Sequence, residues 1–308
     1  MVLSLLKSAA RKVRDQPAVV AALSLPLLLV KRAGVTVPRR LYERLPFRGD
    51  FTLSLSSEGE SCRVRSHGHS VENGLYWEGL AGFEAECMGP WMQFARRSGV
   101  ILDIGANTGM YSMIAHGVSP RAEIHAFEPV SRIAALMRTN VSLNPGARIF
   151  VHELAVGAEN GSANIFDPGG DNAYSASMNA DFLDGEKQSY PVKVTTIDSF
   201  VQTHAITTVD LIKLDVEGFE EFALAGMWKT LQAHRPPMFL EFLDARKSDG
   251  PLVQKIGQLL DMGYRLYQIL PDGIRLSDTI EAAPKGTYNV LLCVPERLPA
   301  SLKATLKS

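Results

Sequence analysis

The stretch Val100-Ile-Leu-Asp-Ile-Gly-Ala-Asn-Thr-Gly109 (VILDIGANTG) joins a short apolar run to two glycines placed four residues apart. A run of this length, followed by the helical pattern of residues 110–116, predicts a buried strand, a tight turn and a helix. Gly105 and Gly109 allow the backbone to approach a ligand closely, and the start of the helix offers free N–H donors. The stretch therefore predicts a ligand site at the end of the first strand of an α/β domain.

The alternation of apolar runs and helical patterns continues to the end of the chain. We expect one helix from Pro129 to Asn144 and another from Pro251. Further strands are expected at residues 123–127, 148–152, 209–214, 238–242, 264–270 and 287–294. Residues 157–184 form a polar stretch rich in Gly, Asn and Ser. Alternating elements with short connections predict a doubly wound, mostly parallel sheet, and a turn at residues 271–273 favours an antiparallel last strand.

The segments ahead of this domain have a different character. Residues 51–64 alternate apolar and polar side chains around the turn SEGES, which predicts a hairpin. A helical pattern follows from Phe83 and is expected to be broken or two-part at Pro90. The predicted organisation is a basic, partly apolar extension (1–48), a cap of hairpin and helix (49–98), the main domain (99–296) and a tail (297–308).

Composition excludes several classes of protein. The 308 residues are 46% hydrophobic and 21% charged, which disfavours collagen-like, disordered and disulfide-stapled chains. Three distant cysteines show no disulfide or zinc pattern and point to a reducing compartment, so we predict a cytoplasmic protein. Residues 1–48 hold ten basic and two acidic side chains, a net charge of +8, so the remainder of a chain of net charge −1 carries −9. An acidic body argues against a nucleic-acid partner.

The apolar run PAVVAALSLPLLLV (17–30) lies within the basic extension. Fourteen residues are too few to cross a bilayer as a helix, and no cleavage site typical of a signal peptide follows them. Two interpretations stay open. Residues 1–48 form a helix that packs on the domain or mediates self-association, or they lie on an anionic membrane surface.

The ends of the first two strands indicate the ligand. A dinucleotide-binding loop needs G-x-G-x-x-G, but Asn107 and Met110 occupy its second and third glycine positions. An acid before the glycines, Asp103, suits a cationic amino-acid group. Glu128, twenty-five residues later, can accept both hydroxyls of a ribose. The pair favours S-adenosylmethionine over a nicotinamide cofactor.

The fourth strand carries a lysine where both faces should be covered, in the sequence DLIKLDVEGFE (210–220). A buried ammonium requires a partner, and Asp215 and Glu217 follow Lys213 closely. The three residues form either a structural ion-pair cluster or a catalytic group that accepts a hydroxyl proton during methyl transfer. Glu241, at the end of the fifth strand, is a weaker candidate. Clustered carboxylates could hold a cation, but nothing in the spacing requires one, and we predict no metal site.

Several segments between residues 75 and 295 resemble the FkbM-type family of S-adenosylmethionine-dependent methyltransferases: VILDIGANTGMYS, HAFEP, TTIDSF, DLIKLDVEGFE and NVLLCVPE. The stretch Gly82–Glu86 departs from the family's Tyr-Glu-x-Glu-like pattern. The resemblance implies a Rossmann-like class I methyltransferase, an α/β fold with a seven-stranded, mostly parallel sheet and an antiparallel last strand. It also implies O-methylation of a sugar, glycan, glycolipid or polyketide-type hydroxyl.

The resemblance also suggests residue roles. The implied cofactor-binding residues are Asp103, Gly105, Ala106, Asn107 and Gly109 at the methionine end, Glu128 with Pro129 at the ribose, and Glu153, Leu154 and Ala155 near the adenine. The stretch Gly169–Ser177 is similar to a family loop near the active site.

The sequence therefore predicts a methyltransferase with a carbohydrate or small-molecule hydroxyl acceptor. Asp215 is the predicted base or base-orienting group, supported by Glu217 and Lys213. Two alternatives stay open, a nicotinamide-dependent oxidoreductase and an inactive binding module. The first lacks both G-x-G-x-x-G and a Tyr-x-x-x-Lys pair.

Overall fold

A computed structural model of the chain describes residues 26–27, 29–31, 34, 37–43, 46–167, 177–178, 188–242, 250–277 and 289–307. The chain divides into two compact units, Met1–Ala85 and Glu86–Ser308. Each unit is described by itself. This division does not test the boundaries predicted from the sequence, which stay predictions.

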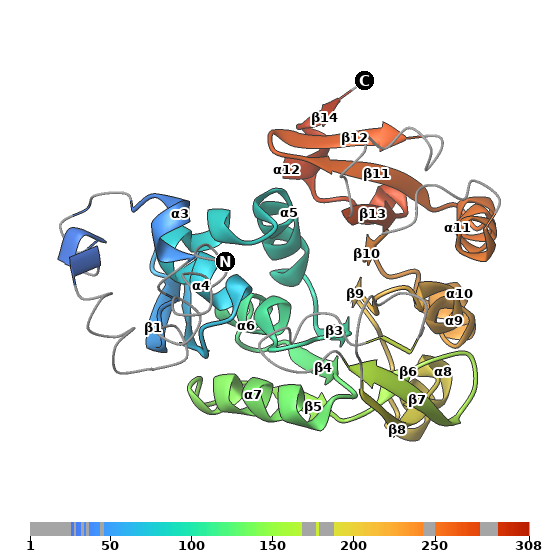
Figure 1. The fold of residues 1–308 in the computed structure, drawn as a ribbon. Coiled ribbons are helices and arrows are strands. Elements are labelled where there is room, and N and C mark those ends of the chain that lie inside the picture. Colours follow the sequence, from blue (N-terminus) through green and yellow to red (C-terminus); the bar gives the residue numbers. More distant parts are fainter. Residues whose placement is uncertain are drawn as a thin grey trace, which may run out of the picture. The chain divides into compact units, whose positions relative to one another are not determined.

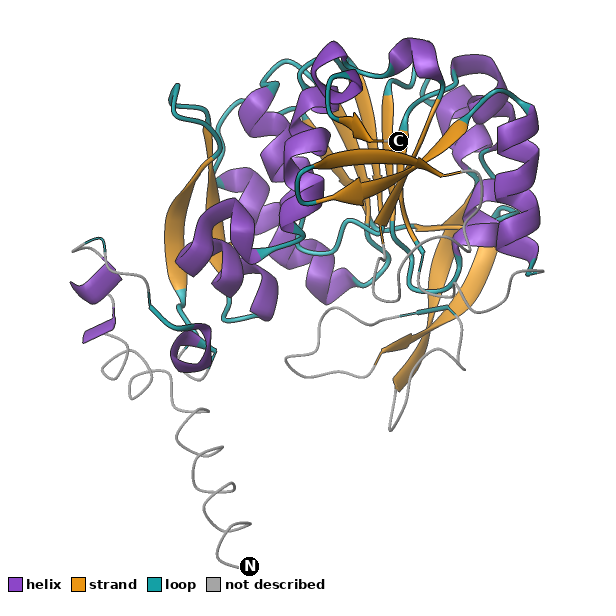
Figure 2. Ribbon diagram, turned by 90° about the horizontal axis from the view of Figure 1, so that it is seen from above, coloured by secondary structure: helices purple, strands orange, loops and turns teal. Residues whose placement is uncertain are grey.

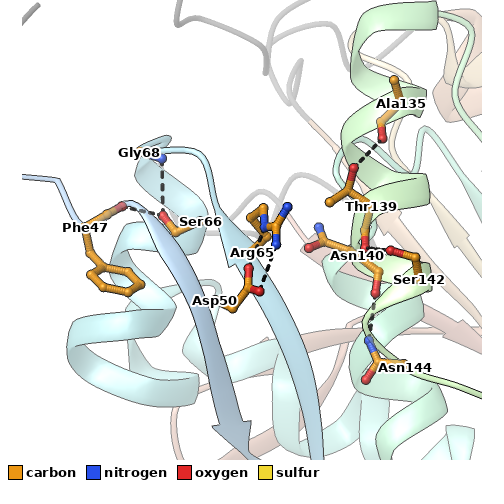
Figure 3. A network of polar contacts seen from close by, with 10 residues as sticks. All are labelled: Phe47, Asp50, Arg65, Ser66, Gly68, Ala135, Thr139, Asn140, Ser142 and Asn144. Carbon is orange, nitrogen blue, oxygen red and sulfur yellow. Dashed lines mark hydrogen bonds and ion pairs between the residues drawn. The ribbon is translucent and has the colours of Figure 1, made fainter. Parts of the chain in front are cut away.

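The first unit contains the expected hairpin. Strands β1 (Gly49–Ser54) and β2 (Ser61–Ser66) are antiparallel, and Leu53 lies opposite Cys62 in the buried face. Across the exposed face, Arg65 forms an ion pair with Asp50 (Figure 3). The remaining elements are helices α3 (Arg39–Tyr42), α4 (Ser70–Glu78) and η1 (Gly79–Gly82).

Helix α4 carries two aromatic residues, Tyr76 and Trp77, which stack on rings from other parts of this unit. The Tyr76 ring stacks on Phe47 with centroids 3.8 Å apart, and the Trp77 ring stacks on Tyr42 at 5.7 Å. The Lys31 ammonium lies 4.1 Å from the centre of the Tyr76 ring, a cation–π contact. These aromatic side chains therefore contribute to the packing of the first unit.

The second unit is built on a nine-stranded sheet of order β14-β12-β11-β13-β10-β9-β3-β4-β5. The strands are β3 (Val100–Ile104), β4 (Glu123–Phe127), β5 (Ile149–His152), β9 (Leu211–Leu214), β10 (Met238–Glu241), β11 (Arg265–Leu270), β12 (Gly273–Ser277), β13 (Asn289–Cys293) and β14 (Leu306–Lys307). The first five are mutually parallel. Strand β13 is antiparallel to both of its neighbours, β10 and β11.

Seven of these strands give the predicted Rossmann-like class I arrangement with its antiparallel last strand. Strands β12 and β14 extend the sheet beyond β11 and were not predicted. The turn at residues 271–273 was expected to lead into the antiparallel last strand. Instead it joins β11 to β12 in a hairpin, and the antiparallel strand β13 follows later in the chain.

Helices cover both faces of the sheet (Figures 1 and 2). Helices α5 (Ala85–Ala95), α6 (Met110–Val118) and α7 (Ser131–Ser142) lie on one side. Helices α8 (Ile197–Thr203), α9 (Glu220–Ala225), α10 (Trp228–His234) and α11 (Pro251–Asp261) lie on the other. Alternation along β9 places Ile212 and Leu214 in the core under the second group, so Lys213 points to the face of the first group.

Two helices differ from the sequence predictions. Helix α5 continues through Pro90, which costs one backbone hydrogen bond, because Cys87, Trp91 and Phe94 bury their side chains along one side. Helix α7 begins at Ser131, with Val130 as the N-cap residue, so Pro129 precedes the helix instead of starting it.

A second, three-stranded sheet has the order β6-β8-β7. It comprises β6 (Ala155–Val156), β7 (Gly161–Asp167) and β8 (Gln188–Thr195). Strand β7 lies in the stretch expected to be only polar. The sequence did not predict this strand because it lacks a run or alternation of apolar residues: of its seven residues, Ile165 and Asp167 alone are fully buried.

The chain closes with η4 (Pro295–Arg297) and α12 (Ala300–Lys303), which precede β14. Within the described residues, no helix has both the length and the apolar character needed to cross a bilayer.

Candidate active site

The glycine turn after β3 lies directly against the end of β9. Gly105 has φ +79°, and a Cβ added there would lie 1.6 Å from the carbonyl oxygen of Asp215. The N–H groups of Gly105 and Ala106 both donate to the Phe127 carbonyl, at 3.0 and 2.9 Å. The ends of β3, β4 and β9 are therefore held together, and only glycine fits at position 105.

The rest of the turn leads into α6. Gly109 is the N-cap residue with φ +88°, and its N–H donates to the Ala106 carbonyl. Asn107 has φ +52°, a left-handed conformation that asparagine tolerates better than most residues. From α7, Asn140 Nδ2 donates to the Thr108 carbonyl at 2.9 Å, and Asn144 Nδ2 donates in turn to the Asn140 carbonyl (Figure 3). Helix α7 thus supports the turn from outside.

Glu128 is a buried carboxylate beside this turn, with only 6% of its surface exposed. Its Oε2 accepts the Asn107 N–H at 3.0 Å, and its Oε1 accepts the Val130 N–H at 2.9 Å. Burial raises the pKa of Glu128 to about 7, although these two backbone donors oppose the shift. Each oxygen keeps a second lone pair, so the group fits the expected role of accepting ribose hydroxyls.

Asp103 is more deeply buried, and its carboxylate accepts the Ser112 hydroxyl at 2.6 Å. Burial raises the pKa of Asp103 to about 6. Its direct partner in the structure is a side chain of α6. Contact with the methionine end of a cofactor stays a prediction for Asp103.

The residues expected near the adenine follow β5. The N–H of Glu128 donates to the His152 carbonyl at 3.0 Å, which places this segment next to the ribose candidate. Glu153 is exposed, forms an ion pair with Arg138 and accepts the Ser131 hydroxyl at 2.7 Å. Leu154 packs against the core, and Ala155 is buried in β6. Pro129 follows Glu128 directly in the chain, and the adenine and ribose contacts of these four residues stay predictions.

Lys213 is 1% exposed and has the partners that its position in the sheet requires. Its Nζ donates to Asp215 Oδ2 and to Asn289 Oδ1, both at 3.1 Å, and lies 4.9 Å from the centre of the Tyr111 ring. Burial raises the pKa of Asp215, but the charge of Lys213 and the hydrogen bonds from Glu241 and Lys213 together hold it below the usual value. Asp215 is therefore the ionised partner of the lysine.

Three carboxyl groups meet at the ends of β9 and β10: Asp215, Glu217 and Glu241, here called the carboxylate cluster. One oxygen from each lies within 4.8 Å of the others. Burial, followed by the charge of Asp215, raises the pKa of Glu217 to about 8 and that of Glu241 to about 11. Such a cluster has the oxygen ligands that a divalent cation prefers. Lys213 already provides one positive charge beside it.

The structure adds two residues that sequence reasoning missed, Tyr111 and Asn289, and gives Ser177 a specific contact. Asn289 lies opposite Glu241 in the register of β13 with β10, and it is the one polar residue at the start of an otherwise apolar strand. The Ser177 hydroxyl donates to the Glu217 carbonyl at 2.6 Å. Ser177 ends the stretch Gly169–Ser177, whose residues 169–176 lie outside the described residues.

Comparison with known proteins agrees with this geometry. A family described as "Methyltransferase FkbM domain" matches residues 103–266, which include the glycine turn, Glu128 and the carboxylate cluster. The 2-O-methyltransferase NoeI of Sinorhizobium fredii is 28% identical over 189 residues, covering 57% of this chain and 76% of that protein.

Two further relatives are similar over shorter parts of the chain. The 31-O-demethyl-FK506 methyltransferase FkbM of Streptomyces tacrolimicus is 27% identical and covers 55% of this chain and 74% of its own length. The hexuronic acid methyltransferase AglP of Haloferax volcanii is 27% identical over 46% of this chain and 55% of its own length.

Proposed function

This chain belongs to the FkbM methyltransferase family and uses S-adenosylmethionine, and on that premise we propose that it methylates a hydroxyl group of a sugar-type or polyketide-type acceptor. The observation that carries the proposal is the carboxylate cluster, which lies against the glycine turn at Gly105. A hydroxyl acceptor must lose one proton during the reaction, and a carboxylate in this position can accept it.

The residues have separable roles in this proposal. S-adenosylmethionine, when bound, supplies an electrophilic methyl group. The Glu128 carboxylate would accept the ribose hydroxyls, and the glycine turn would leave room for the methionine end. Asp215 is held by Lys213 and is the weaker base, so we assign it the role of orienting the acceptor or Glu217. Glu217, with its pKa near 8, is the better proton acceptor.

The acceptor class rests on the relatives. Their names specify a 2-O-methyltransferase, a methyltransferase for 31-O-demethyl-FK506 and one for hexuronic acid. All three fit an oxygen acceptor, and the last two cover both a polyketide-type and a sugar-type substrate. Incubation of cell-extract fractions with methyl-labelled cofactor, sorted into glycolipid, polysaccharide and small-molecule pools, would identify the acceptor.

The test of the site uses Asp215→Asn and Glu217→Gln, with Glu221→Gln on α9 as the matched control. We expect both site variants to lose most turnover while adenosylhomocysteine binding stays within a factor of about three, because neither residue is assigned to the cofactor. The rate of the wild type should rise with pH through about 8, where Glu217 loses its proton. Full turnover in both variants would refute the site. Cofactor binding without turnover on any acceptor would favour an inactive binding module.

We also propose that the basic extension contacts an anionic membrane surface. Leu29, Val30 and Leu41 are among the most exposed large apolar residues described, at 60, 39 and 47%, and the exposed Arg39 and Arg40 precede Leu41. Apolar side chains among excess positive charge suit an acidic lipid surface. The proposal is supported if the protein sediments with phosphatidylglycerol vesicles and not with phosphatidylcholine vesicles. The double variant Leu29→Asp and Leu41→Asp should then no longer sediment with the phosphatidylglycerol vesicles. A concentration-dependent dimer without vesicle binding would show self-association instead.

A further inference from the structure

The turn that carries Glu217 has an unusual backbone. Glu217 has φ +54°, a left-handed conformation that is unfavourable for a residue with a Cβ, and Gly218 follows with φ +87°. The Glu220 carboxylate accepts the N–H groups of Val216 and Gly218, each at 3.2 Å, and so supports the turn from within its own segment. A left-handed residue at a candidate active site persists only where its surroundings hold it.

Ser177 holds the same turn from a different part of the chain. Its hydroxyl donates to the Glu217 carbonyl at 2.6 Å, and the side chain is buried, with 1% of the residue exposed. Its backbone forms an antiparallel bridge with Phe166 of β7, with hydrogen bonds of 2.8 and 3.0 Å in the two directions. Ser177 therefore links the second sheet to the end of β9.

Strand β7 is itself fixed next to the cofactor side of the site. Arg132, in the first turn of α7, donates from Nε and Nη2 to the two oxygens of Asp167, at 3.0 and 2.6 Å. The Tyr190 hydroxyl also donates to Asp167. Since Asp167 follows Phe166 directly, the strand that positions Ser177 is joined to the helix that begins just after Glu128.

We propose that Ser177 is a positioning residue for methyl transfer. Its hydroxyl keeps Glu217 in the left-handed conformation, and this directs the Glu217 carboxylate toward Asp215 and Glu241. The inference rests on the proposed function of Glu217 and adds the group that orients it. It also makes the second sheet a part of the catalytic framework, because the position of Glu217 then depends on β7.

The chain provides a matched control for this hydroxyl. Phe166 pairs with Ser177 on one side and with Ser189 of β8 on the other, and Ser189 is exposed. Ser177→Ala removes the hydroxyl that donates to Glu217. Ser189→Ala removes a hydroxyl from the other residue that pairs with Phe166, and this hydroxyl is exposed. Ser177→Thr keeps a hydroxyl, and Ser177→Cys keeps the size of the side chain with a weaker donor.

We expect Ser177→Ala to lower kcat by about 10- to 100-fold, the scale expected when a reacting group is misplaced by about an ångström. The acceptor KM and the Kd of adenosylhomocysteine should change less than about threefold, because Ser177 touches neither ligand in this proposal. The pKa of Glu217 is raised to about 8 by burial and next by the charge of Asp215. The pH at which the rate is half-maximal should therefore fall in the variant, because the Glu217 carboxylate would move away from that charge. Ser177→Thr should recover most of the rate, and Ser189→Ala should match the wild type.

Crystal structures of the wild type and Ser177→Ala give a readout that needs no acceptor. We expect the φ angle of Glu217 to leave the left-handed region in the variant and to remain there in the wild type. If the wild type methylates nothing, the proposed function fails, and this comparison still decides the role of Ser177. An unchanged Glu217 conformation together with an unchanged pH profile would overturn the inference. If Ser177→Ala does not fold, Ser177→Cys is measured in the same way.

Discussion

Replacing Lys213 by methionine removes the charge of its ammonium group from the buried end of β9. Methionine keeps the length and apolar stem of lysine, so the core around the side chain stays filled. Asp215 and Asn289 each lose a hydrogen bond of 3.1 Å, and the Asp215 carboxylate is left beside two further carboxyl groups. The change therefore tests whether the lysine is needed to keep this carboxylate charged.

The expected loss of stability is about 3 kcal/mol. Removing one partner of a buried ion pair costs roughly 3–5 kcal/mol, and the lower end applies because the Asp215 side chain is 23% exposed to solvent. The size of the effect depends on pH. In the wild type the lowered pKa of Asp215 contributes stability that is present above its unfolded pKa and is lost as the pH falls.

In the variant, the same carboxyl group has its pKa raised by burial and by its acidic neighbours. Its charge then destabilises the fold at high pH, and protonation relieves the penalty as the pH falls. The difference in free energy of unfolding between wild type and Lys213→Met should therefore be largest near pH 8 and smaller near pH 5. Urea unfolding followed by circular dichroism at both pH values measures this difference.

Lys255→Met is the control, because Lys255 also contacts an aromatic ring, Trp228 at 5.1 Å, but is only half-buried. It should change the free energy of unfolding by less than about 0.5 kcal/mol at either pH. Our reasoning about the buried charge is wrong if Lys213→Met is as stable as the wild type at pH 8, or if the difference grows as the pH falls.

Three further predictions concern the cofactor side and the cluster. Gly105→Ala should abolish adenosylhomocysteine binding in calorimetry, because its Cβ would lie 1.6 Å from the Asp215 carbonyl oxygen. Gly146→Ala is the control, because Gly146 has a similar φ of +85° but open space around it, so this variant should lose only about 1–2 kcal/mol of stability, the cost of a left-handed alanine. Glu128→Gln should weaken adenosylhomocysteine binding about 10- to 100-fold. The affinity of the wild type should fall as the pH drops below about 7, where Glu128 gains a proton, and the affinity of the variant should not change over this pH range. EDTA should leave turnover unchanged, because the Lys213 ammonium already contacts the carboxylate cluster. A loss of turnover in EDTA that added Mg²⁺ restores would show that the enzyme requires a metal ion.

The strand ends were predictable from the sequence because their pattern is local. Asp103, Glu128 and Asp215 each follow an apolar run closely, and parallel strands bring such ends to one edge of the sheet. The pairing of Lys213 with Asp215 could be inferred as well, because the cost of an unpaired buried ammonium leaves few alternatives.

The contacts missed from the sequence are those between distant segments. Asn289 reaches Lys213 across 76 residues, and this depends on β13 inserting beside β10. Ser177 reaches Glu217 across 40 residues through a sheet whose strands bury few side chains. Neither contact leaves a periodic signal, since each is made by a single polar atom whose partner is set by strand order.

The order of the main sheet also bears on how the chain folds during synthesis. Strand β13 lies between β10 and β11, yet it is translated after both of them and after β12. Until residues 289–293 leave the ribosome, the facing edges of β10 and β11 have no partner strand, and their buried side chains stay accessible to solvent and to chaperones. A nascent chain halted before Asn289 should therefore be recovered with a holdase chaperone and be cleaved by protease within β10 and β11. A chain halted after the sheet is complete should not bind the chaperone and should resist cleavage in these two strands.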